Sequence, residues 1–540
     1  MNLNLYGYGP AHSRKWIMLD LGVTFGDQFT PGVDIIMPET EFIEEPKKYL
    51  LGIVLTHAHE DHMGALARLW ERFKCPVYAT PFTMYLVRDR LSEAGILDQV
   101  DLREIPLKGK FSLGDFDLEL ITLTHSIPEP NAVAIRTPAG TILHTGDWKI
   151  DHAPMIGEGV DEAALRALGD EGILAMVCDS TNVFSPGEAG SEGDVRREMI
   201  KLVGEFGGRK IAVASFASNV ARLSSVMVAA AENQRSVCLV GRSMLRMYGA
   251  AKAVGILENL AEPIDEMQAA NMPDGNILYL CTGSQGEPRA ALSRIAEGTH
   301  RNVKLSKGDA VIFSSKIIPG NEKGIFALQN MLADNGIEVI TEKARDIHVS
   351  GHPCRDELAQ MYDWARPHIS VPVHGERRHL LEHAKLAKTL GIKHTIAPHN
   401  GEMILLSEKG AKIIDLVPNG RLHEDGGQIV SAGDNGLRER KKMSFAGHIG
   451  VTIVTNNKGD LLAGPEPRIS GWAEGRNGEL IGALLDDVAD IAEKVFRRMS
   501  KKTRVDEDKA EGEIATALRR KFRNMGFKRP LVDVTIMRIN

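Results

Sequence analysis

The segment THAHEDHMG, residues 56–64, places three histidines and an aspartate within six positions. It follows the apolar run LLGIVLT, residues 50–56, which is typical of a buried strand that ends in a tight loop. Imidazole and carboxylate groups suit Zn²⁺, and Mn²⁺ is an alternative. The pattern therefore predicts that His57 and His59 share one cation, while Asp61 and His62 turn toward a neighbouring one.

A centre with two metal ions needs further ligands, and three candidates follow strand-like runs later in the chain. His125 follows ITLT, Asp147 follows ILHTG, and His374 ends the short run SVPVH. A carboxylate such as that of Asp147 can bridge two ions through its two oxygens. Three nearby alternatives to His374 are His368, His379 and His383.

The elements that must position these residues alternate between strands and helices. Strand patterns cover residues 50–56 and 116–124, and two more strands surround a Pro-Ala-Gly turn within residues 131–147. From residue 173 onward, further strand runs are followed by helical patterns near residues 194–206, 220–233, 244–257 and 290–297. Such alternation predicts an α/β fold with layers of helices and sheets.

The pattern changes toward the C-terminus. Residues 418–436 are rich in Gly, Asn and Asp, which favours a linker or an edge hairpin. The last ninety residues or so contain a hairpin pattern, then helical patterns over 480–500 and 506–525, then a strand pattern over 530–539. We therefore expect a separate small α+β unit there.

The composition excludes several classes of protein. The chain has 540 residues, of which 43% are hydrophobic and 25% charged, so a packed core is expected rather than disorder. No run approaches 18 apolar residues and the N-terminus resembles no signal peptide, so neither a membrane span nor secretion is expected. The five cysteines form no CxxC pair, which favours buried thiols in a reducing cytoplasm. The net charge of −7 argues against a chain-wide basic surface but leaves room for a local basic groove.

Together the metal motifs resemble those of the metallo-β-lactamase fold, a four-layer αβ/βα sandwich. The long interval between Asp147 and His374 holds α/β units, as in the β-CASP branch of nucleic-acid-cutting enzymes. Within that branch the chain is identified as a member of the ribonuclease J family. The segments that carry this resemblance are CDSTN (178–182), SFASNVARL (215–223), LVGRSM (239–244), CTGSQGEPRAALSRIA (281–296), HVSGHP (348–353) and VPVHGERRHL (371–380).

The resemblance implies a division into domains. We expect a metallo-β-lactamase core in two parts, residues 1–192 and 351–436, with a β-CASP α/β domain inserted at residues 193–350. A linker at residues 437–447 and a C-terminal α+β domain at residues 448–540 would follow.

The resemblance also implies a function: a two-metal ribonuclease with 5′→3′ exonuclease activity that prefers 5′-monophosphate RNA, together with endonuclease activity, in rRNA processing and mRNA decay. Two close metal ions lower the pKa of a bridging water, so a metal-bridged hydroxide is expected to attack the phosphodiester. The expected ligands are His57, His59, His125 and Asp147 for the first ion, and Asp61, His62, Asp147 and His374 for the second.

Further roles follow from the same resemblance. His352 would lie beside the scissile phosphate, pair with Asp179 and protonate the leaving oxygen; alternatively, Asp179 only caps the following turn. The residues implied for substrate phosphate are Ala217, Ser218 and Asn219 in one segment, and His348, Val349, Ser350, Gly351 and His352 in another. Without the resemblance, these segments would be equally well explained as a helix N-cap and a glycine turn.

The cofactors expected are two Zn²⁺, with Mn²⁺ or Mg²⁺ as alternative activating metals, and a structural Ca²⁺ at Asp34 and Asp434. The expected partners are RNA, one or three further copies of the chain, and a helicase or another ribonuclease. Three alternative functions stay open: a β-CASP nuclease acting on DNA, a small-molecule metallo-hydrolase, and an RNA-binding scaffold whose site is inactive. The last would lack a ligand, and none is missing from this sequence.

Overall fold

The computed structural model describes residues 1–27, 29–44, 49–472 and 479–539. The chain divides into two compact units. The first contains residues 1–23 and 38–419, and the second contains residues 24–37 and 420–540. No helix among the described residues is long and apolar enough to cross a membrane.

The first unit contains two sheets that face one another. In the five-stranded sheet the order is β1 (Asn4–Tyr8), β2 (Lys15–Leu19), β5 (Leu50–Val54), β6 (Val77–Ala79) and β7 (Leu102–Glu104). Strand β1 is antiparallel to β2, and the other neighbours are parallel. The helices of this part are α1 (Glu41–Glu44), α2 (Glu60–Met63), α3 (Leu66–Phe73) and α4 (Pro81–Glu93).

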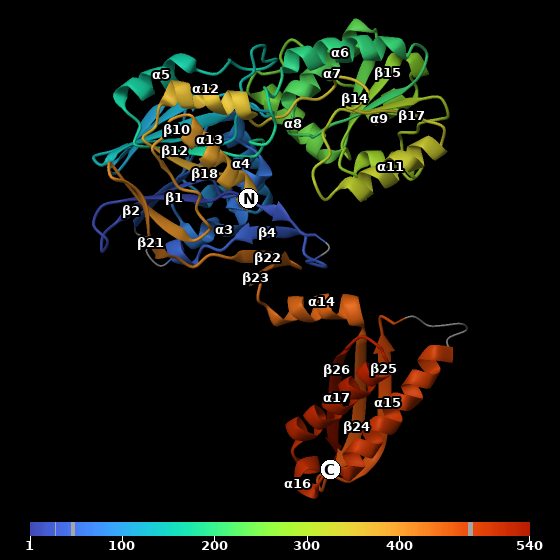
Figure 1. Cartoon of the computed structure of the whole chain (residues 1–540). Helices are drawn as coiled ribbons and strands as arrows, with labels where there is room; N and C mark the ends of the chain where they lie inside the picture. Colours follow the sequence, from blue (N-terminus) through green and yellow to red (C-terminus); the bar gives the residue numbers. More distant parts are fainter. Residues whose placement is uncertain (28, 45–48, 473–478, 540) are drawn as a thin grey trace. The chain divides into compact units, whose positions relative to one another are not determined.

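The second sheet has seven strands. Their order is β19 (His394–Thr395), β18 (Ile369–Val373), β12 (Ala175–Asp179), β11 (Gly140–His144), β10 (Asn131–Thr137), β9 (Phe116–Thr122) and β8 (Lys110–Leu113). From β11 to β19 the neighbours are parallel, and β8 to β11 are antiparallel. Helices α5 (Glu162–Glu171), α12 (Arg355–Ala365) and α13 (Arg377–Thr389) cover one face (Figure 1).

Alternating apolar residues place the two sheets face to face. Ile17 and Val54 of the first sheet are buried in one cluster with Leu118 and Val133 of the second. The opposite face of the second sheet is buried against α5, α12 and α13 in another cluster. Two sheets between helical layers form the predicted four-layer sandwich, which is thereby confirmed.

A third sheet lies between the two halves of this core in the sequence. All its neighbours are parallel, in the order β14 (Ser236–Val240), β15 (Ile277–Cys281), β13 (Ile211–Ala214), β16 (Ala310–Phe313) and β17 (Glu338–Ile340). Its helices are α6 (Glu192–Glu205), α7 (Val220–Glu232), α8 (Arg242–Ala253), α9 (Glu266–Ala270), α10 (Ala291–Ala296) and α11 (Glu322–Asp334). The three central strands β13, β15 and β16 are buried along their whole length, as expected for a parallel sheet covered on both faces. This is the inserted α/β domain.

The remaining elements include a region that the sequence predicted only in part. A hairpin of β20 (Glu402–Ser407) and β21 (Gly410–Leu416) completes the first unit. In the second unit, β3 (Thr24–Phe25), β4 (Ile35–Pro38), β22 (Arg421–Asp425) and β23 (Gln428–Ser431) form a small sheet. Residues 437–447, predicted as a linker, lie almost entirely in helix α14 (Asn435–Ala446). Only Leu437 and Ala446 of this helix are buried, so its sequence lacks the apolar stripe that indicates a helix.

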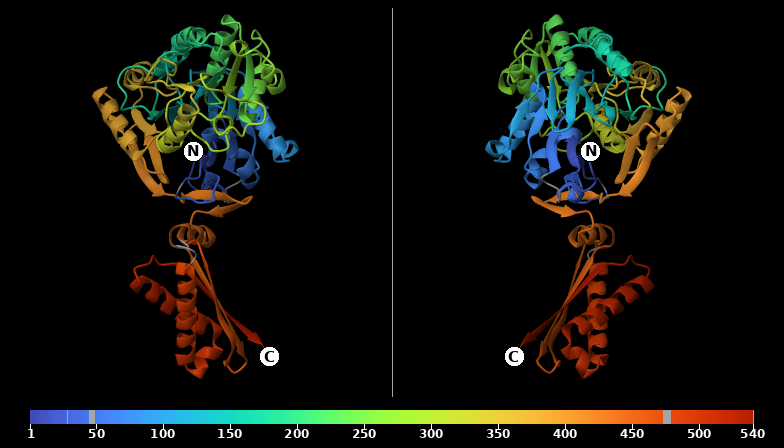
Figure 2. Two further views of the ribbon diagram at one scale, coloured as in Figure 1. Left: turned by 90° about the vertical axis from the view of Figure 1, so that its right-hand side faces the viewer. Right: turned by 90° about the vertical axis from the view of Figure 1, so that its left-hand side faces the viewer.

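The C-terminal part of the second unit is the expected α+β layer. Its sheet has the order β25 (Leu461–Ser470), β24 (His448–Asn456) and β26 (Leu531–Ile539). Helices α15 (Glu479–Arg498) and α17 (Glu507–Asn524) pack on one face of it, and the short α16 (Lys501–Val505) lies between them in sequence (Figure 2). Strand β24 alternates strictly between buried and half-buried residues, so one face of the sheet is covered and the other is open.

Candidate metal centre

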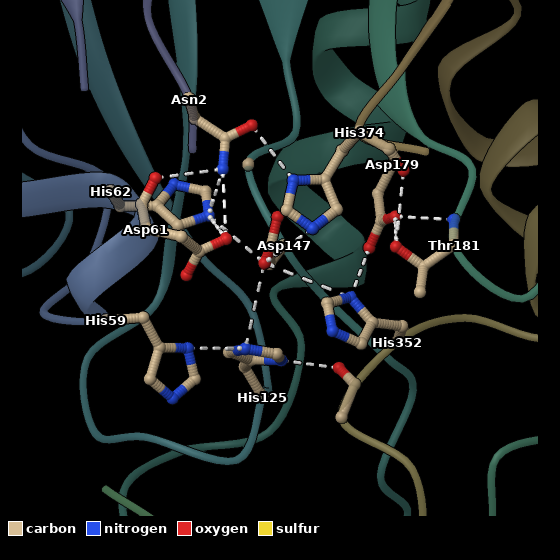
Figure 3. Close-up of polar contacts among 12 residues, drawn as sticks. Asn2, His59, Asp61, His62, His125, Asp147, Asp179, Thr181, His352 and His374 are labelled. Atoms are coloured by element: carbon tan, nitrogen blue, oxygen red, sulfur yellow. Dashed lines mark hydrogen bonds and ion pairs between the residues drawn. The ribbon is translucent and has the colours of Figure 1, made fainter. Parts of the chain in front are cut away.

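Strand ends from both facing sheets converge on one point of the first unit. Strand β5 ends three residues before His57, and β9 ends three residues before His125. Asp147, Asp179 and His374 stand at or just after the ends of β11, β12 and β18. Most of these side chains turn toward the carboxylate of Asp147 (Figure 3).

Two groups of possible ligand atoms form around Asp147. The first group is His57, His59, His125 and Asp147, and the second is Asp61, His62, Asp147 and His374. Within each group the ligand atoms lie within 4.8 Å of one another. The structure therefore brings together all seven predicted ligands, with Asp147 common to both groups. Their role as ligands stays a prediction.

The spacing in the first group fits a single metal ion. His59 Nδ1 lies 3.1 Å from both His57 Nε2 and His125 Nε2. Asp147 Oδ2 lies 3.9 Å from His57 Nε2 and 4.0 Å from His125 Nε2. Ligands about 2.0–2.1 Å from a tetrahedral zinc ion are about 3.3 Å from one another, so these atoms surround a space of suitable size.

The second group has similar spacing and an unsatisfied oxygen. Asp147 Oδ2 lies 3.1 Å from His62 Nε2 and 3.4 Å from His374 Nε2, and Asp61 Oδ2 is 3.5 Å from His62 Nε2. The other oxygen of Asp147, Oδ1, is buried and accepts no hydrogen bond from the described residues. A buried carboxylate oxygen without a donor is costly unless a cation binds it. The donor set therefore fits two hard or borderline metal ions.

Electrostatics prepare the first group for metal binding. Burial and the neighbouring imidazoles lower the pKa of His57 and of His125 well below the usual value for histidine. Burial likewise lowers the pKa of His59 to about 4. These three side chains are thus neutral at physiological pH, and the neutral imidazole is the form that binds a metal.

The second group carries opposite charges at its centre. Burial opposes the charge on His62, but Asp147, Asp61 and Asp20 outweigh it and raise the pKa of His62 well above the usual value. Burial also opposes the charge on Asp147, but His374 and His62 hold the pKa of Asp147 well below its usual value. The ionised carboxylate at the centre thus requires a positive charge beside it, which an imidazolium or a metal ion supplies.

Asp20 orients two of the histidines, and the sequence analysis did not identify it. Its Oδ2 lies 2.7 Å from His62 Nδ1, and its two oxygens accept hydrogen bonds from the N–H and hydroxyl of Thr56. Thr56 Oγ1 also lies 3.0 Å from His57 Nδ1. Such contacts fix the ring orientation and leave the other nitrogen free to face the remaining candidate ligands. The available signal was that Asp20 directly follows β2, the parallel neighbour of β5, so that both strands end at the same edge.

Asn2 is a second residue that the sequence analysis missed. Its amide nitrogen donates to Asp61 Oδ2 at 3.2 Å and lies 2.9 Å from His62 Nε2. Its amide oxygen lies 2.9 Å from His374 Nδ1 and fixes that ring (Figure 3). A single asparagine forms no motif, so nothing in the sequence indicated its place beside the second group.

His352 pairs with Asp179 at the edge of the centre. His352 Nδ1 lies 2.7 Å from Asp179 Oδ2 and 3.9 Å from Asp147 Oδ2. Burial opposes the charge on this ring, but Asp179 raises the pKa of His352 to about 9. Asp179 Oδ1 also accepts hydrogen bonds from the N–H and hydroxyl of Thr181, so it both pairs with His352 and caps the turn. The ring is therefore protonated at neutral pH and has a proton to donate.

The loop that carries His352 is held against His125, one of the candidate metal ligands. The backbone carbonyl of Gly351 accepts a hydrogen bond from His125 Nδ1. A Cβ atom at Gly351 would lie 2.8 Å from His125 Cε1, so the close approach requires glycine. Ser350 Oγ accepts a hydrogen bond from Asn182, whereas the buried Nδ1 atom of the half-buried His348 has no partner among the described residues. Val349, also half-buried, completes the loop.

The segment Ala217–Asn219 lies at the N-terminus of α7, as predicted, but its three residues differ in exposure. Ala217 and Ser218 are half-buried, whereas Asn219 is buried. The side-chain oxygen Oδ1 of Asn219 caps the helix by accepting the N–H of Arg222 at 2.8 Å. Asn219 is therefore the N-cap of α7, and a role of this segment in binding phosphate stays a prediction.

The competing histidines have other partners. His383 is buried between Ser180 Oγ and Tyr362 Oη, both at 2.9 Å. His368 Nε2 lies 2.8 Å from the carbonyl of Glu408, and His379 Nδ1 accepts the N–H of Glu376.

The calcium expectation finds no support in the side chains. Asp434 caps α14 by accepting the N–H groups of Gly436 and Leu437. Among the described residues, no group of three or more ligand atoms includes Asp34 or Asp434.

Four families match successive parts of the chain. Residues 29–169 match the β-lactamase superfamily domain, and residues 208–332 match the ribonuclease J β-CASP domain. Residues 336–398 match the RNA specificity domain of Zn-dependent metallo-hydrolases, and residues 435–539 match the ribonuclease J C-terminal domain. The fold and the site thus define a metallo-β-lactamase-type hydrolase with an inserted β-CASP domain.

Relatives identify the family within this class. Ribonuclease J of Sinorhizobium meliloti is 41% identical over 540 residues, which cover 100% of this chain and 95% of the relative. Ribonuclease J of Corynebacterium glutamicum is 36% identical over 514 residues, covering 93% and 71%. The chain belongs to the ribonuclease J family, and it is a metal-dependent ribonuclease with RNA as its substrate. The DNA nuclease and small-molecule hydrolase alternatives are not favoured.

Proposed function

We propose that this enzyme degrades RNA from the 5′ end in the 5′→3′ direction, prefers a 5′ monophosphate, and also cuts RNA internally. The observation that carries the proposal is the position of the loop 348–352. This loop bonds to His125 of the first ligand group and brings His352 to 3.9 Å from Asp147. RNA bound there would be cut in rRNA processing and mRNA decay, as the family resemblance implies.

We propose two Zn²⁺ ions as the resident metals, with Mn²⁺ or Mg²⁺ able to activate the enzyme in their place. Three neutral imidazoles and one carboxylate suit Zn²⁺ better than Ca²⁺ or Mg²⁺, which prefer oxygen ligands. When bound, such a pair of ions supplies an activated water and offsets charge on the phosphate.

The side chains would then position and protonate the substrate. Asp147 lies between both ligand groups and fixes their separation. His352 would donate its proton to the leaving 3′ oxygen, and Asp179 would keep the ring oriented through its 2.7 Å contact. Asn2 and Asp20 would contribute indirectly, because they hold the rings of His374 and His62 in place through hydrogen bonds.

The 5′ phosphate would bind between the two implied segments. The half-buried Ser218 lies at the N-terminus of α7, where backbone N–H groups favour an anion. Burial, together with the positive charges of Arg222, Lys316 and Lys149, lowers the pKa of His348 to about 3. A positive potential that keeps His348 neutral would also attract a phosphate, and the unpartnered Nδ1 of His348 leaves it free to bond to one.

The 5′ preference gives the first prediction. RNA with a 5′ monophosphate is expected to release mononucleotides at least about tenfold faster than RNA with a 5′ triphosphate, because the few donors cannot neutralise the extra charge. Ser218→Ala should reduce this ratio without changing the metal content, and Ser112→Ala, at an exposed position of β8, should leave it unchanged. The measurement is single-nucleotide release from both RNAs. Equal rates with the unaltered enzyme would contradict the proposed preference.

We further propose that the chain forms a homodimer or homotetramer through the C-terminal unit. One face of its three-stranded sheet is covered by α15 and α17. On the strands of this sheet, Leu462, Met537 and Ile539 are each more than half exposed. Apolar side chains on an open sheet edge favour association with another copy.

This proposal gives the second prediction. Deletion of residues 448–540 is expected to lower the mass measured by light scattering and to weaken activity. Met537→Lys in the full chain should lower the mass in the same direction, because a charge on the sheet opposes association. Lys494→Met, on the exposed face of α15, is the matched control and should leave the mass unchanged. An unchanged oligomer in both the deletion and Met537→Lys would refute this role.

The cellular setting is proposed on the same basis. All five cysteines are free and buried, as is usual in the reducing cytoplasm. We propose that the enzyme acts there, with a helicase or another ribonuclease as a partner. The domain boundaries proposed above, with residues 193–350 as the insertion, enclose the matched β-CASP segment 208–332.

A further inference from the structure

A fully buried ion pair stands behind the two segments proposed to bind the 5′ phosphate. Arg222 of α7 has no exposed surface, and Glu192 at the start of α6 is 3% exposed. Arg222 Nη2 donates to Glu192 Oε1 at 2.9 Å, and Arg222 Nε donates to Glu192 Oε2 at 3.2 Å. This bidentate geometry fixes the plane of the guanidinium group.

Arg222 contacts the first phosphate segment through its backbone, and the residue directly before the second segment through its side chain. Its backbone N–H is capped by Asn219, the last residue of the first segment. Its Nη1 donates to the carbonyl of Ile347 at 2.9 Å, directly before the second segment. Ser314 strengthens this contact, because its hydroxyl lies 2.6 Å from Arg222 Nη1 and donates to the same Ile347 carbonyl at 2.7 Å.

Glu192 extends the contacts toward the metallo-β-lactamase core. Its backbone N–H donates to Asp151 Oδ2 at 2.9 Å. The same oxygen lies 2.8 Å from Nζ of Lys149, which is buried and follows Asp147 by two positions. Continuous buried contacts therefore run from the strand end that carries Asp147, through Glu192 and Arg222, to the two phosphate segments.

We propose that Arg222 is a positioning residue that sets the distance between the 5′-phosphate pocket and the metal centre. This inference rests on the proposed reading of the 5′ end. In exonuclease action, that distance decides which phosphodiester reaches the metals. Arg222 does not touch the substrate. Its guanidinium holds the Ile347 carbonyl and fixes the carboxylate of Glu192, which accepts a hydrogen bond from Asn219 Nδ2 at 3.4 Å.

The chemistry of the side chain makes the role specific to arginine. The guanidinium bonds in one plane to Glu192, Ser314 and Ile347, which requires donors in a rigid fork. Lysine keeps the positive charge but has a single nitrogen, so it cannot reach all three partners at once. Arg222→Lys therefore removes the geometry while keeping the charge of the buried pair.

The experiment compares kcat and KM for nucleotide release from 5′-monophosphate and 5′-hydroxyl RNA of one sequence, using the full chain. In Arg222→Lys, the ratio of kcat/KM for the two RNAs is expected to fall at least about tenfold through a higher KM for the monophosphate RNA. Ser314→Ala, which removes one hydroxyl from the same contact, should lower the ratio in the same direction. If Arg222→Lys does not fold, Ser314→Ala tests the positioning role in its place.

Arg196→Lys is the matched control. Arg196 also joins α6 to α7, through Ser224 and Ser225, but contacts neither phosphate segment. It should keep the wild-type ratio. A merely structural role for Arg222 would lower kcat/KM for both RNAs equally and leave their ratio unchanged. An unchanged ratio in Arg222→Lys would therefore overturn the inference. If only Ser314→Ala folds, an unchanged ratio in that variant would overturn it. If the unaltered enzyme has equal kcat/KM for the two RNAs, the proposed preference for a 5′ monophosphate is itself wrong.

Discussion

Replacement of Asp147 by alanine is expected to lower the rate of RNA cleavage by at least about 10³-fold, because metal-ion catalysis contributes several kcal/mol. Asp147 Oδ2 lies within 4.0 Å of His57, His62, His125 and His374, so both ligand groups lose their common member. Elemental analysis should show two metal ions per chain in the unaltered enzyme and fewer in the variant, while circular dichroism shows the fold retained.

A matched control separates this effect from the loss of any aspartate. Asp363 is exposed on α12, pairs with Arg166 at 3.2 Å and belongs to neither ligand group. Asp363→Ala should keep both metal ions and full activity. Cleavage at the wild-type rate by Asp147→Ala would exclude the proposed metal centre.

Replacement of His352 by alanine is expected to slow RNA cleavage by about 10²–10⁴-fold, the usual contribution of general acid catalysis. Unlike Asp147→Ala, this change should leave the two metal ions at Asp147 in place, because His352 belongs to neither ligand group around Asp147, but to a separate group with Asp179 and His374. Asp179→Asn should act in the same direction, since the carboxylate fixes the ring through the 2.7 Å contact.

The role of proton donor can be tested by changing the leaving group. A nitrophenyl ester of a nucleoside phosphate has a leaving group that needs no proton. The cleavage rate of His352→Ala should therefore fall less than about tenfold with this ester, whereas its rate with RNA should fall much further. His368→Ala, a histidine bonded to the carbonyl of Glu408, is the control and should cleave both substrates normally. Equal losses of His352→Ala on RNA and ester would assign His352 to binding or structure instead.

The sequence predicted the fold well where a pattern was strong. Alternating strands and helices indicated the α/β layers, and the interval between Asp147 and His374 indicated the inserted domain. The pattern failed at α14, where the charged run of residues 438–442 has no apolar stripe. It also gave no sign that residues 24–37 belong to the second unit, because the pairing of β4 with β22 joins segments far apart in the chain.

For the site, residue types with a metal-binding pattern were predictable and their supports were not. The seven candidate ligands follow strand ends, where side chains converge, and the structure brings them together. Asp20 and Asn2 lacked a motif, because their role depends on which strands become neighbours. The role of Gly22 was equally hidden. A Cβ atom there would lie 1.7 Å from the carbonyl oxygen of Asp61, so only glycine lets the chain pass the metal-binding loop.

The order of the ligands along the chain has a consequence for the time at which activity arises during synthesis. His57 is made early, but His374 follows the entire inserted domain. At about 5–20 residues per second, a ribosome needs roughly 15–60 s to pass from one to the other. Until then the second ligand group lacks a member, whatever has already folded. A nascent chain therefore completes the candidate metal centre only after 374 of its 540 codons have been translated.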